Sequence, residues 1–337
     1  MKQYLDLFID DEYPDFIDKY LSTDTLERLK HVTQFCGCDY TRLYSPLFKY
    51  TRFDHSLVVA HMTWHFTHDK KETIAALLHD IGTPCFAHCI DYVFGDYVNQ
   101  ESSEKSTVDM IKKDVKLQEL LKQDNLCIDD FRNYSNYHIL ENKSPKLCTD
   151  RLDGVLHSCY IWLHTHNLKQ IKEVYNDLTI LVNEDDVCEI GFRNIDVAEK
   201  FVFMVYNYAK ALRENVNKYT MKYVSEIVKL AVSNGFISLN DLYTEKEENI
   251  CDIFKTKFPS WEKFNNSTKL ISTDILPKNN FYISFEAKKR NTIPLVYTDT
   301  GSKRINLVSD IALEQYNKLM IYKDKKYGYI EEIDILN

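Results

Sequence analysis

Turn-forming residues are scarce in this chain. It contains 8 glycines and 7 prolines among 337 residues, whereas these two residue types make up about 12% of an average protein. Sandwiches and barrels of short strands need a turn about every ten residues, so this scarcity argues against an all-β fold. It also excludes collagen-like and linker-like chains. We therefore expect a chain that is mainly helical.

The spacing of apolar residues divides the chain into two parts. From Thr23 to about Val232 they recur every three or four residues, which predicts helices. The pattern changes near Asn234 and Gly235. Beyond that point the candidate elements are two strands at Phe281–Ala287 and Ile293–Tyr297, a helix at Ile311–Met320 and a strand pair within Ile321–Ile333. The predicted fold is mainly α, with a helical core over residues 1–235 and a smaller mixed α/β region over residues 236–337.

The net charge restricts the partners of the chain. Lys and Arg number 42 against 51 Asp and Glu, which gives a net charge of −9. Such a chain repels phosphates at long range, so nucleic acid and anionic membranes are disfavoured as partners. An anionic substrate would need a local basic site or a metal. The sequence shows no signal peptide and no long apolar run, and its nine cysteines form no CxxC pair, so we expect a cytoplasmic protein with reduced thiols.

An adjacent histidine and aspartate end a predicted buried helix. The apolar run Ile74–Leu78 leads directly into His79 and Asp80, and Gly82 and Pro84 then stop the helix. A carboxylate in such a place is costly unless it is paired or bound to a metal. An HD dipeptide also arises by chance, in which case it is a capped helix end with a hydrogen-bonded histidine.

Two further residues extend this pair to a candidate metal site. His55 opens a helix upstream and Asp150 opens another downstream, which makes a set of two imidazoles and two carboxylates. That set suits Mn²⁺, Fe²⁺, Co²⁺, Ni²⁺, Zn²⁺ or, less comfortably, Mg²⁺. Four ligands leave positions open for water and a substrate oxygen, so the site would activate water and polarise a phosphoryl group.

The joint pattern resembles a known family. Arg52-x-x-His55, HDIG from His79 and the segment TDRLDG at Thr149–Gly154 resemble motifs of the HD superfamily of metal-dependent phosphohydrolases. Within it, the chain resembles the deoxynucleoside triphosphate triphosphohydrolase branch, which includes the bacterial dGTP triphosphohydrolases. The segments that carry the resemblance are LERLKHVTQFCG, YTRFDHSL, HDIGTPCFAH and, in the tail, FYISFEAKKRNTIPLV and RINLVSDIA. The resemblance extends along most of the chain and implies an HD-domain helical core.

The resemblance implies roles for particular residues. One divalent metal would be held by His55, His79, Asp80 and Asp150. Substrate phosphate would contact Arg52 and Arg151, while His88 and Asp91 would be catalytic groups that orient water or protonate a leaving oxygen, and Tyr219 and Lys222 would lie on a helix that contacts the sugar.

Four departures from the family pattern fall at expected substrate-binding positions. Thr83 stands where relatives have a histidine, and Gln100 stands near the place of the histidine in a His-Glu pair. Gly154 replaces a tyrosine, and Ser158 stands where relatives place an aspartate near the 3′-hydroxyl of deoxyribose. The metal ligands are kept while the sugar-reading positions change. We expect phosphoryl hydrolysis with an altered substrate or cleavage position.

Three functions remain open at this point. The first is hydrolysis of (deoxy)nucleoside triphosphates to nucleoside and tripolyphosphate through a metal-activated water. The second is an HD phosphatase or phosphodiesterase for another phosphorylated metabolite, and the third is a non-catalytic, nucleotide-binding regulatory homologue. By resemblance we expect a homo-oligomer, a dimer or higher. The basic residues Lys288–Arg290 and Lys303–Arg304 are interpreted as solvated turns.

Overall fold

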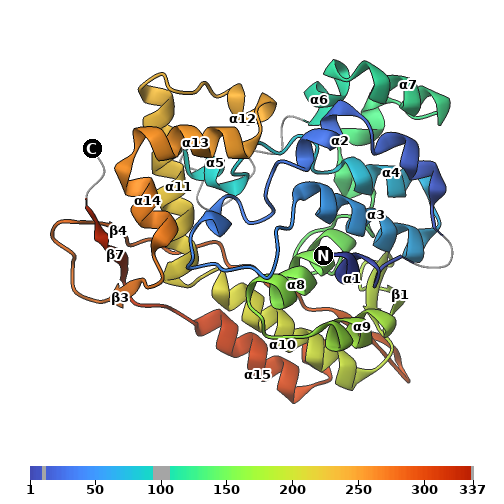
Figure 1. The fold of residues 1–337 in the computed structure, drawn as a ribbon. Helices are drawn as coiled ribbons and strands as arrows, with labels where there is room; N and C mark the ends of the chain where they lie inside the picture. Colours follow the sequence, from blue (N-terminus) through green and yellow to red (C-terminus); the bar gives the residue numbers. More distant parts are fainter. Residues whose placement is uncertain (10–12, 94–106, 335–337) are drawn as a thin grey trace.

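The structure is a computed structural model that describes residues 1–9, 13–93 and 107–334 (Figure 1). Helices account for 53% of the chain and strands for 11%, which confirms a mainly α protein with a smaller α/β part. The predicted division at residue 235 stays a prediction. The four-stranded sheet described below combines strands from both sides of that residue.

The helices before residue 235 form the surroundings of the HD segment. They are α1 (Lys2–Leu5), α2 (Asp24–Leu29), α3 (Arg52–Thr67), α4 (Lys70–Leu78), α5 (His88–Val93), α6 (Thr107–Lys113), α7 (Val115–Gln123), α8 (Thr149–His157), α9 (Leu168–Asn176), α10 (Ile195–Ala211) and α11 (Asn215–Ser233). A π-helical turn, Ser158–Trp162, continues α8. The helices after residue 235 are α12 (Asp241–Thr244), α13 (Glu247–Lys257), α14 (Pro259–Asn266) and α15 (Asp310–Ile321).

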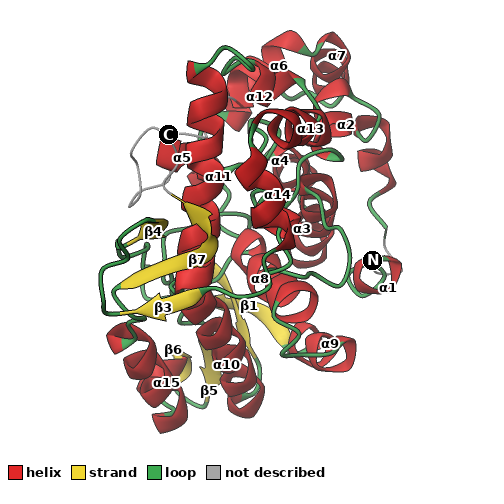
Figure 2. Ribbon diagram, turned by 60° about the vertical axis from the view of Figure 1, so that its left-hand side comes forward, coloured by secondary structure: helices red, strands yellow, loops and turns green. Residues whose placement is uncertain are grey.

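Two small sheets lie at different places along the helical body (Figure 2). One has the order β1-β2-β5-β6, from strands Leu178–Val182, Cys188–Phe192, Leu295–Thr298 and Gly301–Arg304. The other has the order β3-β7-β4, from strands Ile271–Thr273, Tyr327–Asp334 and Asn280–Ile283. All neighbours are antiparallel except the parallel pair β2 and β5. Sheet β3-β7-β4 packs on α11, and the other sheet packs on α10.

The tail follows the predicted pattern, with one shift. Helix α15 spans Asp310–Ile321, close to the predicted Ile311–Met320, and strands β4 and β5 fall within or beside the predicted runs. The expected strand pair over Ile321–Ile333 is a single strand, β7, because Ile321 still belongs to α15. The hairpin β1-β2 interrupts the region that we predicted to be helical. Its signal was present in the sequence, as an apolar run followed by the turn-forming residues 183–186.

Local signals begin and end the helices that carry the site. Thr51 caps α3 through a capping box in which its side chain accepts from the backbone N–H of Asp54 and Asp54 accepts in return. Asp69 caps α4 by accepting from the backbone N–H of Glu72. Helix α4 then ends at His79, as the sequence predicts. These two helices pack directly on each other.

The buried apolar side chains form two clusters. The smaller cluster joins α2, α4, α6 and α7 with one face of α3, through residues such as Leu77, Leu78 and Val59. The larger cluster includes α8, α10, α11 and the opposite face of α3, for which Val58 and Leu152 are representative. Helix α3 therefore contributes to both clusters. The HD segment at the end of α4 lies where they meet.

Candidate metal centre and substrate cavity

The four predicted ligand residues come together from three helices. His55 lies in the first turn of α3, His79 and Asp80 follow α4, and Asp150 lies in the first turn of α8. The Nε2 atom of His55 lies 3.0 Å from Asp150 Oδ1 and 3.9 Å from Asp80 Oδ2. The Nε2 atom of His79 lies 3.8 Å from Asp80 Oδ2 and 3.7 Å from Asp150 Oδ1. Two imidazole nitrogens and two carboxylate oxygens thus face one point.

The orientation of His79 leaves one ring nitrogen for a cation. Its Nδ1 hydrogen-bonds to the carbonyl oxygen of Ala76 at 2.6 Å, so Nδ1 carries the proton and Nε2 has a lone pair. That Nε2 atom is buried and has no hydrogen-bond partner among the residues that the structure describes. A buried acceptor without a donor is costly, and a bound metal ion would satisfy it.

His55 is fixed by a buried carboxylate that the metal-ligand prediction did not include. Its Nδ1 lies 2.6 Å from Oδ2 of Asp153, which is fully buried. Asp153 also accepts from the hydroxyls of Tyr4 at 2.6 Å and Tyr50 at 3.0 Å, and contacts His157 Nδ1 at 3.2 Å. A carboxylate behind a histidine is the usual second partner of a metal ligand, because it sets the tautomer and raises the basicity of the ring.

The pKa shifts show that the site favours positive charge. Burial alone would lower the pKa of His55, but hydrogen bonds to Asp150 and Asp153 raise it to about 10. Burial would raise the pKa of Asp80 and of Asp150, yet neighbouring positive groups hold both below the ordinary value. For Asp80 these groups are Arg52 and the two histidines. A site whose carboxylates stay ionised and whose imidazoles attract protons suits a cation.

The donor set fits a divalent metal. Ligand atoms about 2.1 Å from a common ion are separated by roughly 3.0 to 3.5 Å, close to the separations observed between the four side chains. The mixture of nitrogen and oxygen donors suits first-row divalent ions. A second group, His55, Asp153 and His157, also has ligand atoms within 4.8 Å of one another. Its carboxylate is already shared among two tyrosines and two histidines, so it is better explained as support for His55.

Arg52 and Thr83 both hold Asp80. The Nη1 atom of Arg52 lies 2.9 Å from Asp80 Oδ2, and the Thr83 hydroxyl donates to Oδ1 at 3.0 Å. The backbone around Thr83 is held by Arg28 of α2, whose Nη2 donates to the carbonyls of Ile81 and Thr83. Thr83, which stands where the family has a histidine, therefore orients the predicted metal ligand Asp80.

The predicted ligands form part of the lining of a cavity of roughly 630 Å³. The other predicted site residues in its lining are Arg52, Thr83, His88, Arg151, Gly154 and Ser158. Its described lining contains six Lys or Arg residues and three Asp or Glu residues, whereas the whole chain has a net charge of −9. The cavity is thus locally basic in an acidic protein, which favours an anionic ligand.

His88 and Asp91 form a pair in which only the histidine reaches the cavity. The Nδ1 atom of His88 lies 3.0 Å from Asp91 Oδ2, and Asp91 is fully buried behind it. This contact places the proton on Nδ1 and leaves Nε2 to exchange a proton with a ligand. Burial lowers the pKa of His88, and the charges of Arg290 and Arg52 lower it further.

The guanidinium of Arg151 is largely occupied by the protein. It donates to Glu141 Oε1 at 3.1 Å, to the Lys146 carbonyl at 3.0 Å and to the Asn142 carbonyl at 2.5 Å. Glu141 also lines the cavity, and burial followed by the charge of Asp150 raises its pKa to about 7. Sequence reasoning missed Glu141, which lies in a loop with no motif around it.

Gly154 faces a tyrosine from a different helix. A Cβ atom at Gly154 would lie 4.0 Å from the hydroxyl of Tyr208, which comes from α10 and lines the same cavity. Ser158, one turn further along, is buried and also lines the cavity. The small residues at 154 and 158 therefore leave space on this wall, and Tyr208 occupies part of it.

Two predicted substrate residues, Tyr219 and Lys222, are not brought to the cavity. Tyr219 is fully buried against Tyr223 and Phe281, and Lys222 pairs with Glu226. Neither residue lines the cavity. The reason is helical phase, since Asn217 and Met221, one turn apart on α11, are the residues that line it. Gln100 lies outside the described residues.

An aromatic wall and a basic segment were not predicted as parts of the site. Tyr44 and Trp162 stack with centroids 4.5 Å apart and planes at 8°, and both line the cavity with Phe35. Lys288, Lys289 and Arg290 also line it, which corrects our interpretation of that segment as a solvated turn. Arg304 is likewise no solvated residue, because it forms ion pairs with Glu184 and the buried Glu189.

Comparisons with known proteins find one similar protein along nearly the whole chain and a second along about half of it. The uncharacterised protein YdhJ from Bacillus subtilis is 26% identical over 328 residues, which is 94% of each chain. The uncharacterised protein MG461 from Mycoplasma genitalium is 24% identical over 197 residues, which is 52% of this chain and 46% of that protein. No family profile matches the chain.

Solved structures share the fold along nearly the whole chain. A hypothetical protein from Aquifex aeolicus superposes with a TM-score of 0.63 at 18% identity, covering 93% of this chain and 91% of that one. A protein named phosphohydrolase BT4208, from Bacteroides thetaiotaomicron, superposes with a TM-score of 0.58 at 15% identity, covering 96% of this chain and 97% of that one. Within the described ranges, no helix has the length and apolar character that a membrane crossing requires.

Proposed function

We propose that this chain is a metal-dependent phosphohydrolase of the HD type that converts (deoxy)nucleoside triphosphates to nucleoside and tripolyphosphate. One observation carries the proposal: His55, His79, Asp80 and Asp150 converge, and the buried Nε2 of His79 lacks a hydrogen-bond partner among the described residues. The name of the structural neighbour from Bacteroides thetaiotaomicron supports the same class of reaction.

In the proposed reaction, different residues of the cavity have different roles. When bound by these four residues, a divalent ion would lower the pKa of a water molecule and polarise a phosphoryl oxygen. Arg52 lies beside the ligands and offers a planar guanidinium suited to phosphate. In the reaction, the water oxygen bonds to phosphorus, the bond from phosphorus to the nucleoside oxygen breaks, and that oxygen takes a proton. His88 is placed to pass this proton, and Asp91 positions His88.

The dimensions of the cavity agree with a nucleotide. Its volume of roughly 630 Å³ lies in the range typical of small-molecule sites, about 300–1,000 Å³. The Tyr44–Trp162 stack and Phe35 provide flat apolar surface for a base or sugar. The space beside Gly154 and Ser158 favours a second candidate as well, a phosphatase or phosphodiesterase for another phosphorylated metabolite.

The direct test uses metal-free protein loaded with Mn²⁺ and incubated with each dNTP and NTP in turn. Ion-exchange chromatography then separates tripolyphosphate, pyrophosphate and phosphate. We expect tripolyphosphate from at least one nucleotide, and we expect H79A and D80A to abolish its release. The matched control is H138A, which removes an exposed histidine outside the cavity.

Other outcomes decide among the alternatives. Hydrolysis of a phosphomonoester or phosphodiester probe without any action on nucleotides would replace the proposal with the second candidate. Nucleotide binding without turnover under every metal would support a regulatory protein. Equal activity of H79A, D80A and wild type would place the active site elsewhere.

A further inference from the structure

One side of the cavity is a row of residues on α8 and on the π-helical turn that continues it. Residues four apart in a helix lie on the same face, about 6 Å from one another along the axis. The row consists of Asp150, Gly154, Ser158 and Trp162, and all four line the cavity. It begins at a predicted metal ligand and ends at the aromatic wall, where Trp162 stacks on Tyr44. A ligand along this row would have a phosphate at one end and a flat apolar group at the other.

The middle of this row has little polar chemistry of its own. Gly154 has no side chain, and Ser158 has a short one that is buried. The group that lies over Gly154 comes from another helix, because the hydroxyl of Tyr208 is 4.0 Å from the position that a Cβ atom at Gly154 would occupy. Tyr208 belongs to α10 and lines the same cavity. A polar group thus lies between the two ends of the row, and α10 supplies it.

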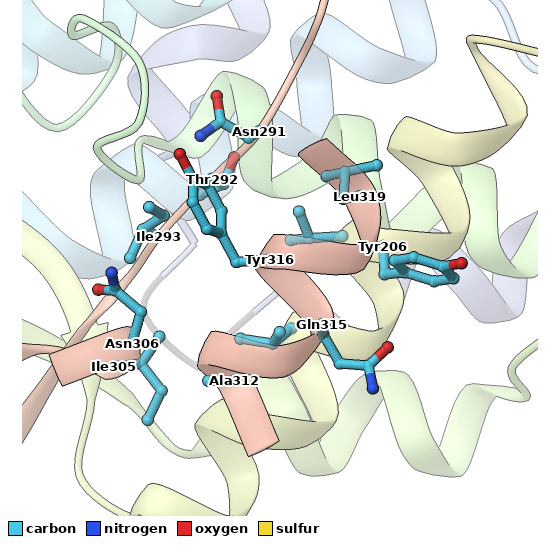
Figure 3. Close-up of a pocket in the computed structure, with 12 residues that line it drawn as sticks. Tyr206, Asn291, Thr292, Ile293, Ile305, Asn306, Ala312, Gln315, Tyr316 and Leu319 are labelled. Carbon is cyan, nitrogen blue, oxygen red and sulfur yellow. The ribbon is translucent and has the colours of Figure 1, made fainter. Parts of the chain in front are cut away.

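Helix α10, which carries Tyr208, is held by its neighbours. It packs on both α8 and α15. Tyr206, two residues before Tyr208, borders a small hollow of about 20 Å³ beside Tyr316 and Leu319 of α15 (Figure 3). Two residues along a helix turn a side chain by about 200°. Tyr208 therefore faces the cavity, while Tyr206 faces the hollow beside α15.

The Tyr208 hydroxyl is available to a ligand. It makes no hydrogen bond to the residues that the structure describes. The two other tyrosines in the described lining use their hydroxyls within the protein, because Tyr44 donates to Asn217 and Tyr134 donates to the Leu78 carbonyl at 3.2 Å. Burial raises the pKa of Tyr208 above its ordinary value, so its hydroxyl stays protonated and can donate.

We propose that Tyr208 is a specificity-determining residue that donates a hydrogen bond to a sugar hydroxyl of the substrate. The inference rests on the proposed function, which places the reacting phosphate at the metal ligands. A phosphate at Asp150 and a base at Trp162 would leave the sugar between them, beside Gly154, where the Tyr208 hydroxyl lies. A substrate that lacks this sugar hydroxyl would bind more weakly, because Tyr208 would lose its partner.

The experiment measures the binding of three sugars and of one anion that has no sugar. Isothermal titration calorimetry with metal-free protein compares NTPs, dNTPs and 2′,3′-dideoxy NTPs that carry the same base, together with inorganic tripolyphosphate. The wild-type affinity should fall about three- to tenfold when one of the two sugar hydroxyls is removed, which is the loss expected for one neutral hydrogen bond. Y208F should show no such preference and should bind tripolyphosphate as wild type does. The matched control is Y206F, which removes a hydroxyl from the same helix outside the cavity and should keep the wild-type preference.

The possible results separate the inference from the proposed function. A wild-type protein that binds the three sugars equally, or binds no nucleotide, would overturn the inference. A weaker affinity of Y208F for tripolyphosphate would also overturn it, because the hydroxyl would then contact phosphate or support the fold. Hydrolysis of nucleotides with the same sugar preference in Y208F and wild type would keep the proposed function and refute the inference. A protein that hydrolyses no nucleotide, but whose sugar preference disappears in Y208F, would keep the inference and refute the proposed reaction.

Discussion

Asp153 links the buried core to the candidate metal site through its contact with His55. Its carboxylate is fully buried. It accepts hydrogen bonds from His55, His157 and two tyrosine hydroxyls. Burial would raise its pKa, but His157 and His55 hold that pKa below the ordinary value, so it remains an ionised acceptor. An ionised group at this position makes the His55 ring a stronger ligand.

Replacing this carboxylate by its neutral isostere is expected to weaken metal binding. Because partners behind a ligating histidine typically contribute about 10- to 100-fold in metal affinity, D153N should bind Mn²⁺ weaker by about that factor. Competition with a metal chelator measures the affinity. The control D114N neutralises a buried aspartate that caps α7, away from the site, and should leave it unchanged. Equal affinities of D153N and wild type would remove Asp153 from the metal centre.

Gly154 is expected to lower the free energy of unfolding, while its missing side chain leaves space in the cavity. It lies inside α8, where glycine costs about 1 kcal/mol relative to alanine. An added Cβ would meet only the Tyr208 hydroxyl at 4.0 Å, an ordinary contact distance. G154A should therefore raise the free energy of unfolding by about 0.4–1 kcal/mol, measured by urea unfolding.

A second glycine provides the contrasting control. Gly37 has a φ of +77°, and a Cβ there would lie 2.5 Å from the Phe86 ring. G37A should therefore destabilise the protein, because both backbone and packing oppose the added atom. If G154A destabilised the protein as G37A does, the wall at Gly154 would be closed rather than open.

At the scale of elements, the loop between α4 and α5 is held by the C-terminal region. Phe86 in this loop has a φ of +62°, which is unusual for a residue with a side chain. Its backbone N–H donates to Glu247 Oε2 of α13 at 2.9 Å, and the neighbouring Cys85 N–H donates to the Leu242 carbonyl at 2.8 Å. This anchoring fixes the loop that leads from Asp80 to His88.

The buried Glu247 makes the stability of this anchor depend on pH. Burial, with the charge of Asp39, raises the pKa of Glu247 from 4.5 to about 8. The folded state therefore binds more protons than the unfolded state between these values, and stability falls as pH rises through this window. The slope from one such group is at most about 1.4 kcal/mol per pH unit.

E247Q is expected to flatten this dependence. The Glu247 carboxyl accepts from the Thr33 hydroxyl and from the Phe86 N–H. The amide of E247Q keeps an oxygen that can accept from the Phe86 N–H, but it does not ionise. The melting temperature of E247Q relative to wild type should rise steadily from pH 5 to pH 8.5, measured by scanning calorimetry. Parallel melting curves over this range would show that Glu247 is ionised in the folded protein throughout.

At the scale of the whole molecule, local signals and the set of four metal ligands were readable from sequence, but the other walls of the cavity were not. The end of α4 at His79 followed from an apolar run and the Gly82 and Pro84 that stop it. The position of Tyr208 over Gly154 depends on the packing of α10 on α8, which no spacing in the sequence reveals. Lys288, Lys289 and Arg290 also line the cavity through tertiary packing that no spacing in the sequence reveals.

Helical phase set a second limit to prediction. The sequence predicted that the helix that became α11 lies beside the site, but it did not determine which face of this helix lines the cavity. Asn217 and Met221 line the cavity, whereas Tyr219 points into the core on the opposite face. A shift of two residues along a helix turns a side chain by about 200°, so an alignment error of that size reverses an assignment.

The metal centre lies where the two hydrophobic clusters meet, which gives metal binding a structural consequence. His79 and Asp80 follow α4, whose apolar face belongs to the smaller cluster, and Asp150 opens α8, which belongs to the larger. His55 comes from α3, which contributes to both. A bound ion would therefore join the two clusters as well as offset the unsatisfied Nε2 of His79.

Metal removal is therefore expected to destabilise the whole chain, not only the active site. A ligand that binds only the folded state stabilises it by about 2.7 kcal/mol at one hundred times its dissociation constant. Adding Mn²⁺ to the metal-free protein at that ratio should raise the melting temperature, and excess chelator should reverse the change. Amide hydrogen exchange should slow in both α4 and α8, because the ion would link the helices. In H79A the same Mn²⁺ concentration should have little effect, and an equal rise in H79A and wild type would mean that the ion binds at a different place.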